Sequence, residues 1–533
     1  DWSSDVCSSD LNVDLYQWQK DCLKAWEDHA YRGIVNVITG AGKTVFALEA
    51  EKRLRELYPD LKVRIVVPTI PLASQWKQAL LRRAEEECDF PGFFGGTRKD
   101  PADRRYMIYI INSARTALSR HIRADLAVGS HVLLICDECH HYQSKENRKI
   151  FDFLNADVQE SPLYCSLGLS ATPFDNEENR AFLQRVLGKE IYRYDFIRAQ
   201  QDGVISTFTV SQVAANFRAK ERDAYDELSE ELRLVLAKLL KACPKLRDLP
   251  EKEFMRKVTA MAKASNYDPS TLPAAFLLLC YQRKEISVMA ETRIECCRDL
   301  IDRLPGQDRI LIFCERIEQA EMTAITLRKR FGAGCCGIYH SKMTKEARTR
   351  NMALFREGQT RILVSCRCLD EGIDVPDANI GIVLSGSAVE RQRIQRLGRI
   401  IRRAPEKDAA CLYYIYIREA AEDRAFLHEI PESRSFDLQY DVREKDFSND
   451  LYEYAANDLL YTAKAAGYNT AQMRELRRCL LLGLTRADYL LPESAQLQNI
   501  EAAEPKREKN YWNTMYRMGK YFETGEENNH HEL

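Results

Sequence analysis

The fold of this chain is decided by one stretch, GIVNVITGAGKT, at residues 33–44. An apolar, β-branched run at 33–38 passes directly into a glycine loop, and a helical pattern, VFALEA, follows. The glycines allow tight turns and a close backbone approach, and amides at the start of a helix point at an anion. The stretch therefore predicts a phosphate-binding loop between a buried strand and a helix.

The chemistry of this loop follows from its residue types. Lys43 is expected to reach the β- and γ-phosphates of a nucleotide, and Thr44 is expected to hold Mg²⁺. The longer form of such a loop has a glycine where Val37 stands, so the match is to the shorter pattern Gly-x-Gly-Lys-Thr. The alternative is a structural turn with a chance lysine. The residues expected to bind the nucleotide here are Thr39, Gly40, Ala41, Gly42, Lys43 and Thr44.

Apolar runs of strand length recur along the chain in two groups. Runs of this length, separated by helix-length segments, are typical of parallel sheets buried on both faces. The pattern predicts two α/β lobes. The first group lies at 33–38, 63–67, 106–111, 131–136 and 163–170, and the second at 309–314, 337–339, 361–366, 379–385 and 411–417.

The domain organisation expected from these patterns has five parts. Residues 1–11 match the translation of a common sequencing-library adapter and are left out of the fold; the alternative is a genuine Ser/Asp-rich start. If they are adapter, residue 12 need not be the natural start of the chain. Three- and four-residue apolar spacing between 213 and 300 indicates helices. The remaining parts are a first lobe at 12–212, a helical insertion or linker at 213–300, a second lobe at 301–430 and a helical C-terminal extension at 431–533.

Composition limits the classes of protein that this chain can represent. Its 533 residues predict several domains, and 45% hydrophobic residues are enough to build their cores. The 78 basic residues nearly balance the 80 acidic ones, so any nucleic-acid surface must be local. The longest apolar runs are far shorter than the ~20 residues of a membrane span. We expect a cytoplasmic protein with no membrane span, whose 17 scattered cysteines are reduced.

A pair of carboxylates follows the apolar run that ends at Cys136. Enzymes with a phosphate loop hold Mg²⁺ with a carboxylate at the end of a buried strand, and an adjacent glutamate can orient and deprotonate water. Asp137 is therefore predicted to bind the metal, and Glu138 to act as the base. The alternative is zinc, because Cys136 and Cys139 are followed by His140 and His141. A structural zinc site needs four convergent ligands, and the sequence offers no second such pair.

Nine ordered motifs resemble those of superfamily 2 helicases and translocases. The resemblance covers roughly residues 12–420 and implies two RecA-like lobes in tandem that use ATP and Mg²⁺. The motifs are LYQWQ (15–19, Q-type), TGAGKT (39–44, motif I), VPTIPLASQW (67–76, Ia), DECH (137–140, II), SATP (170–173, III), LIFCERIEQA (311–320, IV), YHSKMTKEAR (339–348), CLDEGIDVPDA (368–378, V) and QRLGRIIRR (395–403, VI).

The resemblance implies roles for further residues. In the first lobe, Gln19 would read adenine, Pro68 and Thr69 would lie beside the nucleic-acid backbone, and His140, Ser170 and Thr172 would couple nucleic acid to hydrolysis. In the second lobe, Gly372 and Asp374 would contact the nucleotide, Gln395 the nucleotide or attacking water, and Arg399 and Arg402 would be arginine fingers. The six arginines between 391 and 403 suit this, because a guanidinium is a planar donor for phosphate oxygens.

The details of three motifs favour one branch of the superfamily. QW in motif Ia, DEGIDVP in motif V and QRxGRxxR in motif VI resemble the DNA-repair-type branch, with its XPB-like and restriction-enzyme-like translocases. Motif Ia lacks the PTRELA form of DEAD-box RNA helicases, and Cys366 and Tyr16 replace the threonine and arginine of many relatives. We expect a DNA helicase or translocase that favours duplex DNA, with a nuclease as a candidate protein partner. The oligomeric state is left open.

Three alternative functions stay open at this point. They are an RNA helicase or RNA-activated sensor, the motor subunit of a restriction or phage-defence complex, and a nucleic-acid scaffold with dead ATPase sites. The C-terminal stretch 506–522 interleaves basic and aromatic residues, which suits nucleic acid. Such a stretch is more often an amphipathic helix packed on its neighbour.

Overall fold

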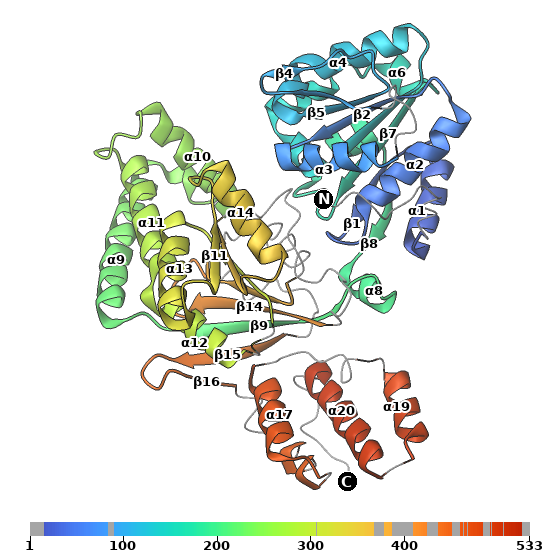
Figure 1. Ribbon diagram of the computed structural model, residues 1–533. Coiled ribbons are helices and arrows are strands. Elements are labelled where there is room, and N and C mark those ends of the chain that lie inside the picture. Colours follow the sequence, from blue (N-terminus) through green and yellow to red (C-terminus); the bar gives the residue numbers. More distant parts are fainter. Residues whose placement is uncertain are drawn as a thin grey trace. The chain divides into compact units, whose positions relative to one another are not determined.

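The described residues form two compact units, the first ending at Ile205 and the second beginning at Ser206. Figure 1 colours the first unit blue to blue-green and the second green to red. The structure is a computed structural model. It describes residues 15–83, 90–304, 306, 308–366, 378–385, 409–423, 435–449, 459–461, 463–465, 467–482, 491, 493–504 and 506–524.

The first unit is built on an eight-stranded sheet. Its strands are β1 (Arg32–Val37), β2 (Lys62–Val67), β3 (Gly92–Gly95), β4 (Arg98–Lys99), β5 (Tyr106–Ile110), β6 (Val132–Asp137), β7 (Tyr164–Ser170) and β8 (Glu190–Tyr194). They lie in the order β4-β3-β5-β2-β6-β7-β1-β8. Neighbours are parallel except β3 and β4, which are antiparallel. The strand ends that follow β1 and β6 therefore reach the same edge of the sheet.

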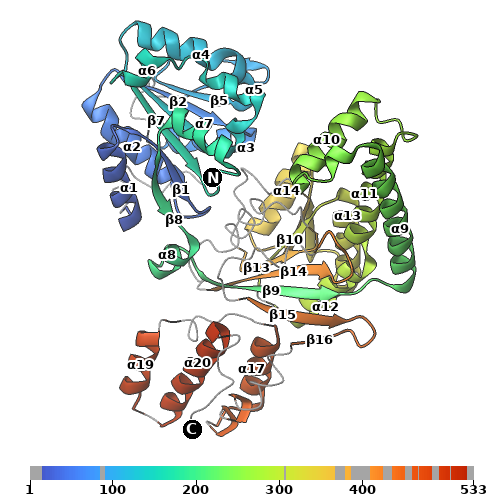
Figure 2. The same cartoon turned by 180° about the vertical axis from the view of Figure 1, so that it is seen from behind.

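Helices cover both faces of this sheet (Figures 1 and 2). They are α1 (Gln17–Asp28), α2 (Lys43–Leu57), α3 (Ile70–Leu81), α4 (Ile111–Ala127), α5 (Lys145–Arg148), α6 (Ala156–Glu160), α7 (Glu177–Leu187) and α8 (Phe196–Gln201), with 3₁₀ turns η2 (Cys139–Gln143) and η3 (Lys149–Phe151). The apolar side chains of α4 and α7 pack with alternate residues of β6 in one cluster. Every residue of β6 and β7 is buried, as expected for a sheet covered on both faces.

The second unit contains another eight-stranded sheet. Its strands are β9 (Thr207–Ala215), β10 (Ile310–Cys314), β11 (Cys336–Tyr339), β12 (Ile362–Cys366), β13 (Ile380–Val383), β14 (Ala409–Ile417), β15 (Ser435–Asp441) and β16 (Asp446–Ser448). They lie in the order β11-β12-β10-β13-β14-β9-β15-β16. Neighbours are parallel except β15 and β16. The expected pair of α/β lobes is confirmed.

The expected strands match the structure, and several further strands were not predicted. The ten predicted runs form strands whose ends differ from the prediction by at most two residues. The additional strands of the first sheet are β3, β4 and β8, which carry exposed or half-buried side chains and therefore lack a continuous apolar run. Because the physical signal was burial on both faces, it missed strands at the sheet margins.

Strand β9 changes the boundary between the lobes. It pairs in parallel with β14 over nine residues and with β15 on its other side. The expected boundary after residue 212 falls inside this strand, whereas the units divide between Ile205 and Ser206. The segment expected to be helical at 431–533 likewise begins with β15 and β16, which extend the same sheet.

The helices of the second unit differ in what they pack against. They are α9 (Ala219–Ala242), α10 (Glu251–Ala264), α11 (Leu272–Met289), α12 (Glu291–Arg303), α13 (Ile317–Phe331), α14 (Lys345–Arg356), α17 (Thr470–Leu482), α19 (Glu493–Ala502) and α20 (Lys506–Thr524). Helices α9 to α11 share an apolar cluster of their own. Helix α12 instead packs on the sheet through Cys296 and Cys297. The inserted helical part of the expected segment 213–300 is therefore α9 to α11.

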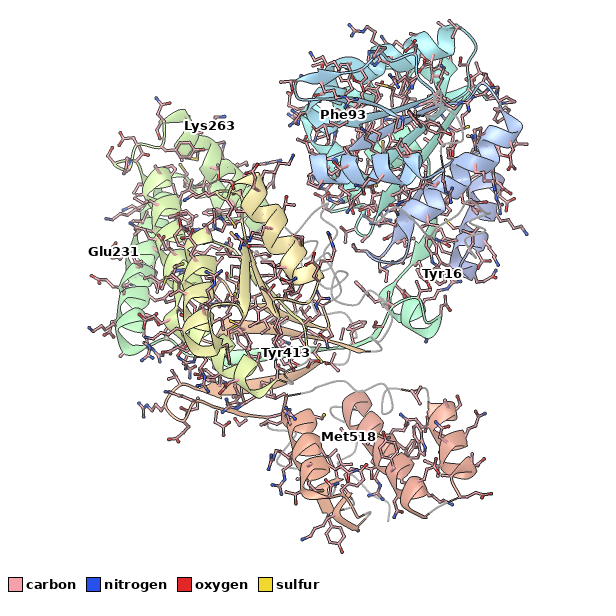
Figure 3. All side chains as sticks on the ribbon, viewed as in Figure 1. Tyr16, Phe93, Glu231, Lys263, Tyr413 and Met518 are labelled. Atoms are coloured by element: carbon pink, nitrogen blue, oxygen red, sulfur yellow. The ribbon has the colours of Figure 1, made fainter. Side chains whose placement is uncertain are left out.

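Helix α20 contains the basic and aromatic stretch noted in the sequence. Met515 and Met518 of this helix are buried in the same apolar cluster as Tyr413 of β14. Figure 3 labels Met518 on α20 and Tyr413 on its strand. Lys520 forms an ion pair with Glu493 of α19 at 3.0 Å. The stretch is an amphipathic helix packed on its neighbours, and a nucleic-acid role for its outer face stays a prediction.

Two negative findings hold for the part of the chain that the structure describes. No helix there is both long and apolar enough to cross a membrane. The cysteines there form no disulfide. Most of them are buried in strands and helices, where a thiol packs as a small apolar side chain.

Candidate active site

The phosphate loop lies between β1 and α2, as the sequence predicts. Gly40 has a φ of 93° and Gly42 a φ of 92°, in the left-handed region that glycine adopts without steric cost. A Cβ on Gly42 would come within 3.0 Å of Nε2 of Gln19. Helix α2 begins directly after the loop, at Lys43. The glycines therefore allow a backbone path that other residues would distort.

The side chain of Gln19 holds this loop from α1. Its Nε2 donates a hydrogen bond to the carbonyl oxygen of Gly42 at 3.2 Å, and its Oε1 accepts one from the backbone N–H of Tyr16 at 3.0 Å. Only 1% of Gln19 is exposed. Both ends of the amide are thus engaged within the first unit. The adenine contact expected of Gln19 stays a prediction beside this observed role in the loop.

The loop has the donors that a phosphate group needs. Thr39 Oγ1 is buried, and no described residue hydrogen-bonds to it. The first amides of a helix have no partner within the helix, and the helix dipole adds partial positive charge there. Ala41 is buried just before that turn, and Thr44 lies within it, half-buried. The residues present therefore fit a phosphate anion.

Asp137 is the last residue of β6, and its carboxylate is held on both oxygens. The indole Nε1 of Trp76 donates to Oδ2 at 2.9 Å, and the backbone N–H of Glu138 donates to Oδ1 at 3.0 Å. Burial, and then the adjacent charge of Glu138, raise the pKa of Asp137 to about 6, while Lys43 and the Trp76 hydrogen bond oppose the rise. A nearby cation would stabilise the ionised form of this buried carboxylate, so Asp137 fits Mg²⁺ as a ligand.

Glu138 lies between the phosphate loop and η2. Its Oε1 is 3.2 Å from Nζ of Lys43, and its Oε2 is 3.4 Å from Nδ1 of His140. Its backbone has a φ of 47°, in the left-handed region. For a residue other than glycine this conformation costs about 1 kcal/mol. The fold thus brings Lys43 and Glu138, which are far apart in the sequence, into contact. The backbone is strained at Glu138.

Polar contacts continue from Glu138 through His140 to the end of β7. Nδ1 of His140 is 2.9 Å from Oγ of Ser170, and that hydroxyl oxygen accepts a hydrogen bond from the backbone N–H of Thr172 at 3.1 Å. His140 and Ser170 are both buried. The residues expected to couple nucleic acid to hydrolysis therefore lie beside the predicted base. Their role in coupling stays a prediction.

Pro68 and Thr69 connect β2 to α3. Thr69 is the N-cap of the helix, and its hydroxyl oxygen accepts a hydrogen bond from the backbone N–H of Leu72 at 3.5 Å. Both residues are half-buried, and the expected contact with nucleic acid stays a prediction. The sequence analysis gave no role to Trp76, on the same helix, although an indole needs a hydrogen-bond partner when it is buried.

The cysteines of the alternative zinc site lie in the core. Cys136 belongs to β6 and Cys139 to η2, and both are buried. Burial raises the pKa of the Cys136 thiol well above its usual value, which opposes the thiolate that zinc requires. Within the described ranges, no three His, Cys, Asp or Glu side chains are grouped so that they could hold a metal ion.

The predicted site residues of the second lobe lie outside the described residues. They are Gly372, Asp374, Gln395, Arg399 and Arg402. The strands that precede them, β12 and β13, are described and fully buried. Their roles stay predictions that rest on the motifs.

Two family models match the chain in the order of its lobes. The model described as "Type III restriction enzyme, res subunit" matches residues 12–175. The model described as "Helicase conserved C-terminal domain" matches residues 292–404. The first match contains the phosphate loop and Asp137, and the second contains motifs IV to VI.

Known proteins resemble the chain over most of its length. The DNA 3'-5' translocase XPB2 of Sulfurisphaera tokodaii is 30% identical over 412 residues, which are 77% of this chain and 83% of the relative. The XPB subunit of the TFIIH basal transcription factor complex of Trypanosoma brucei brucei is 23% identical, over 84% of this chain and 43% of its own. The chain spans about half the length of other curated relatives.

A solved structure supports the fold. The crystal structure of the helicase MrfA bound to DNA superposes with a TM-score of 0.50 and 12% identity, over 80% of this chain and 53% of MrfA. At this identity the likeness shows the fold alone, and it confirms the expected pair of RecA-like lobes. Taken with the sequence relatives, it shows that the chain belongs to the XPB-like group of superfamily 2 helicases, a class of nucleic-acid-dependent ATPases.

Proposed function

We propose that this protein is an ATP-driven motor that moves along duplex DNA. The observation that carries the proposal is the 3.2 Å contact between Lys43 of the phosphate loop and Glu138 beside Asp137. It brings together, in one unit, the groups that phosphate binding and water activation require. DNA as the track is supported by the relative from Sulfurisphaera tokodaii, which is named a DNA translocase.

In this proposal each residue of the first unit has a separate task. Thr44 and Asp137 would hold Mg²⁺, which when bound neutralises charge on the β- and γ-phosphates. Lys43 binds the same phosphates through its ammonium group. Glu138 orients the attacking water and accepts its proton. Phosphate binding and water activation therefore belong to different side chains and can be lost separately.

The ion pair between Lys43 and Glu138 suggests how ATP prepares the base. A bound triphosphate competes with the Glu138 carboxylate for the ammonium group, because both are anions within reach of Lys43. Once Lys43 turns to the phosphates, Glu138 keeps its contact with His140 and becomes accessible to water. His140 also contacts Ser170, at the end of β7. A change of conformation at the end of β7 would thus alter the contacts that hold Glu138.

The second lobe supplies the remaining groups in this proposal. Arg399 and Arg402 would act as arginine fingers on the γ-phosphate, and Gln395 would contact the nucleotide or attacking water. Gly372 and Asp374 would contact the nucleotide from motif V. These assignments rest on the motif resemblance and on the match of residues 292–404 to the helicase C-terminal model.

Steady-state ATP turnover on matched nucleic acids tests the proposed track. Duplex DNA is expected to stimulate turnover more than single-stranded DNA or duplex RNA of the same length, with little dependence on base sequence. Affinity should fall steeply as salt rises, because each neutralised phosphate releases counterions. The control is Lys43→Ala, which should abolish hydrolysis on every substrate. Stronger stimulation by RNA would contradict the DNA assignment and leave the hydrolysis site unaffected.

A second candidate is the motor subunit of a restriction or phage-defence complex. It is favoured by the match of residues 12–175 to the restriction-subunit model. In that case a nuclease on another chain would bind this protein, and DNA cleavage would depend on its ATP turnover. The test is purification from the native cell, followed by a cleavage assay with and without ATP. Cleavage that is lost with Lys43→Ala would support this candidate; a copurified nuclease that cuts without ATP would oppose it.

A further inference from the structure

The indole of Trp76 contacts the carboxylate of Asp137 inside the first unit. Its Nε1 donates to Oδ2 at 2.9 Å, and the two residues are 1% and 5% exposed. The Glu138 N–H occupies one site on the other oxygen. An ionised carboxylate offers about four acceptor sites, so these two hydrogen bonds fix its plane and leave positions for a cation. The contact therefore sets the direction in which Asp137 presents its remaining lone pairs.

The segment that carries Trp76 is joined to Asp137 at a second point. The hydroxyl of Tyr142 lies 2.6 Å from the carbonyl oxygen of Val66 and 3.1 Å from that of Asp137. Val66 precedes Pro68 and Thr69, and α3 then leads to Trp76. The side chain and the backbone of Asp137 are thus both tied to one continuous stretch of the chain, residues 66–76.

We propose that Trp76 is a positioning residue that aims the Asp137 carboxylate at Mg²⁺ and connects it to the start of α3. The proposal rests on the proposed function, because it takes Asp137 as the metal-binding carboxylate. Trp76 does not touch the nucleotide in this scheme and acts through Asp137. The N-cap Thr69 is seven residues earlier, so a helix of about 10 Å links the expected nucleic-acid contact to the metal site.

Physical chemistry sets the expected size of the effect. A hydrogen bond to a charged group is stronger than a neutral one, and partners that orient a metal ligand typically change metal affinity by about 10–100-fold when they are removed. Trp76→Phe keeps an aromatic ring in the core and removes only the N–H donor and the five-membered ring. The half-saturating Mg²⁺ concentration should rise ~10-fold in this variant.

Trp26 provides a matched control in the same unit. It is 1% exposed, and its Nε1 donates to the backbone carbonyl oxygen of Ser166 at 3.0 Å. Trp26→Phe therefore removes an equally buried indole hydrogen bond that does not reach Asp137. A general loss of packing would affect both variants, whereas a positioning role affects only Trp76→Phe.

The experiment measures binding of a fluorescent, non-hydrolysable ATP analogue to the full chain, first in a chelator and then as Mg²⁺ is added. In the chelator, wild type, Trp76→Phe and Trp26→Phe should bind the analogue equally. As the Mg²⁺ concentration rises, wild type and Trp26→Phe should gain affinity for the analogue at the same Mg²⁺ concentration. Trp76→Phe should gain it at a Mg²⁺ concentration ~10-fold higher. Wild-type Mg²⁺ dependence in Trp76→Phe, or an equal shift in both variants, would overturn the proposal.

A third variant separates this inference from the proposed function. Asp137→Asn should by itself abolish most of the Mg²⁺-dependent gain, and adding Trp76→Phe to it should cause little further loss, because the two changes act on one contact. If Asp137→Asn leaves the Mg²⁺ dependence unchanged, the metal assignment fails. If Asp137→Asn has its effect and Trp76→Phe adds its full shift on top, the positioning role fails while the metal assignment stands.

Discussion

Glu138 and Glu315 each directly follow a buried strand of their sheet, yet we expect them to have different functions. Each is the first residue after a buried central strand, β6 or β10, and they are 9% and 7% exposed. Each carboxylate is paired with a lysine: Glu138 with Lys43 at 3.2 Å, and Glu315 with Lys284 at 2.6 Å. The two glutamates therefore share their position after a strand, their burial and their pairing with a lysine. The expected difference in function must come from the residues around them.

The surroundings differ in backbone conformation and in the origin of the lysine. Glu138 has the left-handed φ of 47°, and Lys43 comes from the phosphate loop. Glu315 is not among the described residues with positive φ; its N–H donates to Ser385 Oγ at 3.0 Å, and Lys284 comes from α11 of the helical insertion. Strain that persists at a buried residue indicates a functional constraint. One pair faces the predicted chemistry, and the other joins α11 to the second sheet.

The largest expected effect tests this contrast directly. Glu138→Gln should lower ATP turnover by about 10²–10⁴-fold, the range for loss of a general base, while nucleotide affinity is kept. Glu315→Gln is the matched control and should leave turnover close to wild type. The measurement is steady-state ATP turnover with saturating duplex DNA, together with nucleotide binding. A Glu138→Gln enzyme that turns over at the wild-type rate would remove this residue from the base role.

The next effect concerns stability where two interior strands of the second sheet, β13 and β14, end. Arg293 is 1% exposed, pairs with Asp423, and donates to the carbonyl oxygens of Leu384 and Ile415 at 2.6 Å each. Arg293→Met leaves the Asp423 carboxylate buried without its partner and should destabilise the second unit by about 3–5 kcal/mol. Hydrogen exchange should show the loss of protection in β13 and β14 and not in β1 or β6.

A surface arginine of the same unit provides the control for Arg293. Arg330 pairs with Asp302 at 2.8 Å, and both side chains are exposed. Arg330→Met should change the free energy of unfolding by no more than about 1 kcal/mol, because surface ion pairs contribute little. Equal losses of protection in the two variants would contradict a structural role for the buried pair.

A smaller effect separates two roles of Gln19. Gln319 resembles it in the second unit, because its amide also bonds at both ends, to Glu315 and Val288. Gln19→Ala should weaken nucleotide binding by about 5–10-fold, the value of one hydrogen bond, and Gln319→Ala should not change it. If Gln19 holds the loop, ATP and GTP lose affinity equally. If it reads adenine, ATP alone is affected.

The smallest effect reports backbone strain. Glu138→Gly and Glu138→Ala both remove the carboxylate, but only glycine relieves the left-handed backbone, so the glycine variant should be about 1 kcal/mol more stable. At residue 315 the order should reverse, because glycine there only adds freedom to the unfolded chain. Urea denaturation of the four variants provides the comparison. The same order at both positions would show that the strain at Glu138 is not significant.

Local sequence was sufficient for most strands and for the separate halves of the site. A continuous apolar run between helices reports burial on both faces, so ten strands could be predicted. Strands β8 and β15 could not, because their side chains are only partly buried or alternate between buried and exposed. Strand β9 is buried, but Thr209, Ser211 and Gln212 interrupt its apolar residues, so it has no continuous apolar run. The glycines around Ala41 and the carboxylates at the end of β6 likewise indicated their chemistry, since each signal depends on neighbours within a few residues.

Only the tertiary structure brought those halves together. The 3.2 Å contact between Lys43 and Glu138 joins the first residue of α2 to the first residue after β6, and no local pattern encodes their distance. The same holds for Trp76 and Asp137, which meet because β2 and β6 are parallel neighbours with α3 returning across the sheet. The sequence determined which groups are present and on which element each one lies. Parallel strand order decided which of them touch, because it aligns the carboxyl ends of distant strands at one edge.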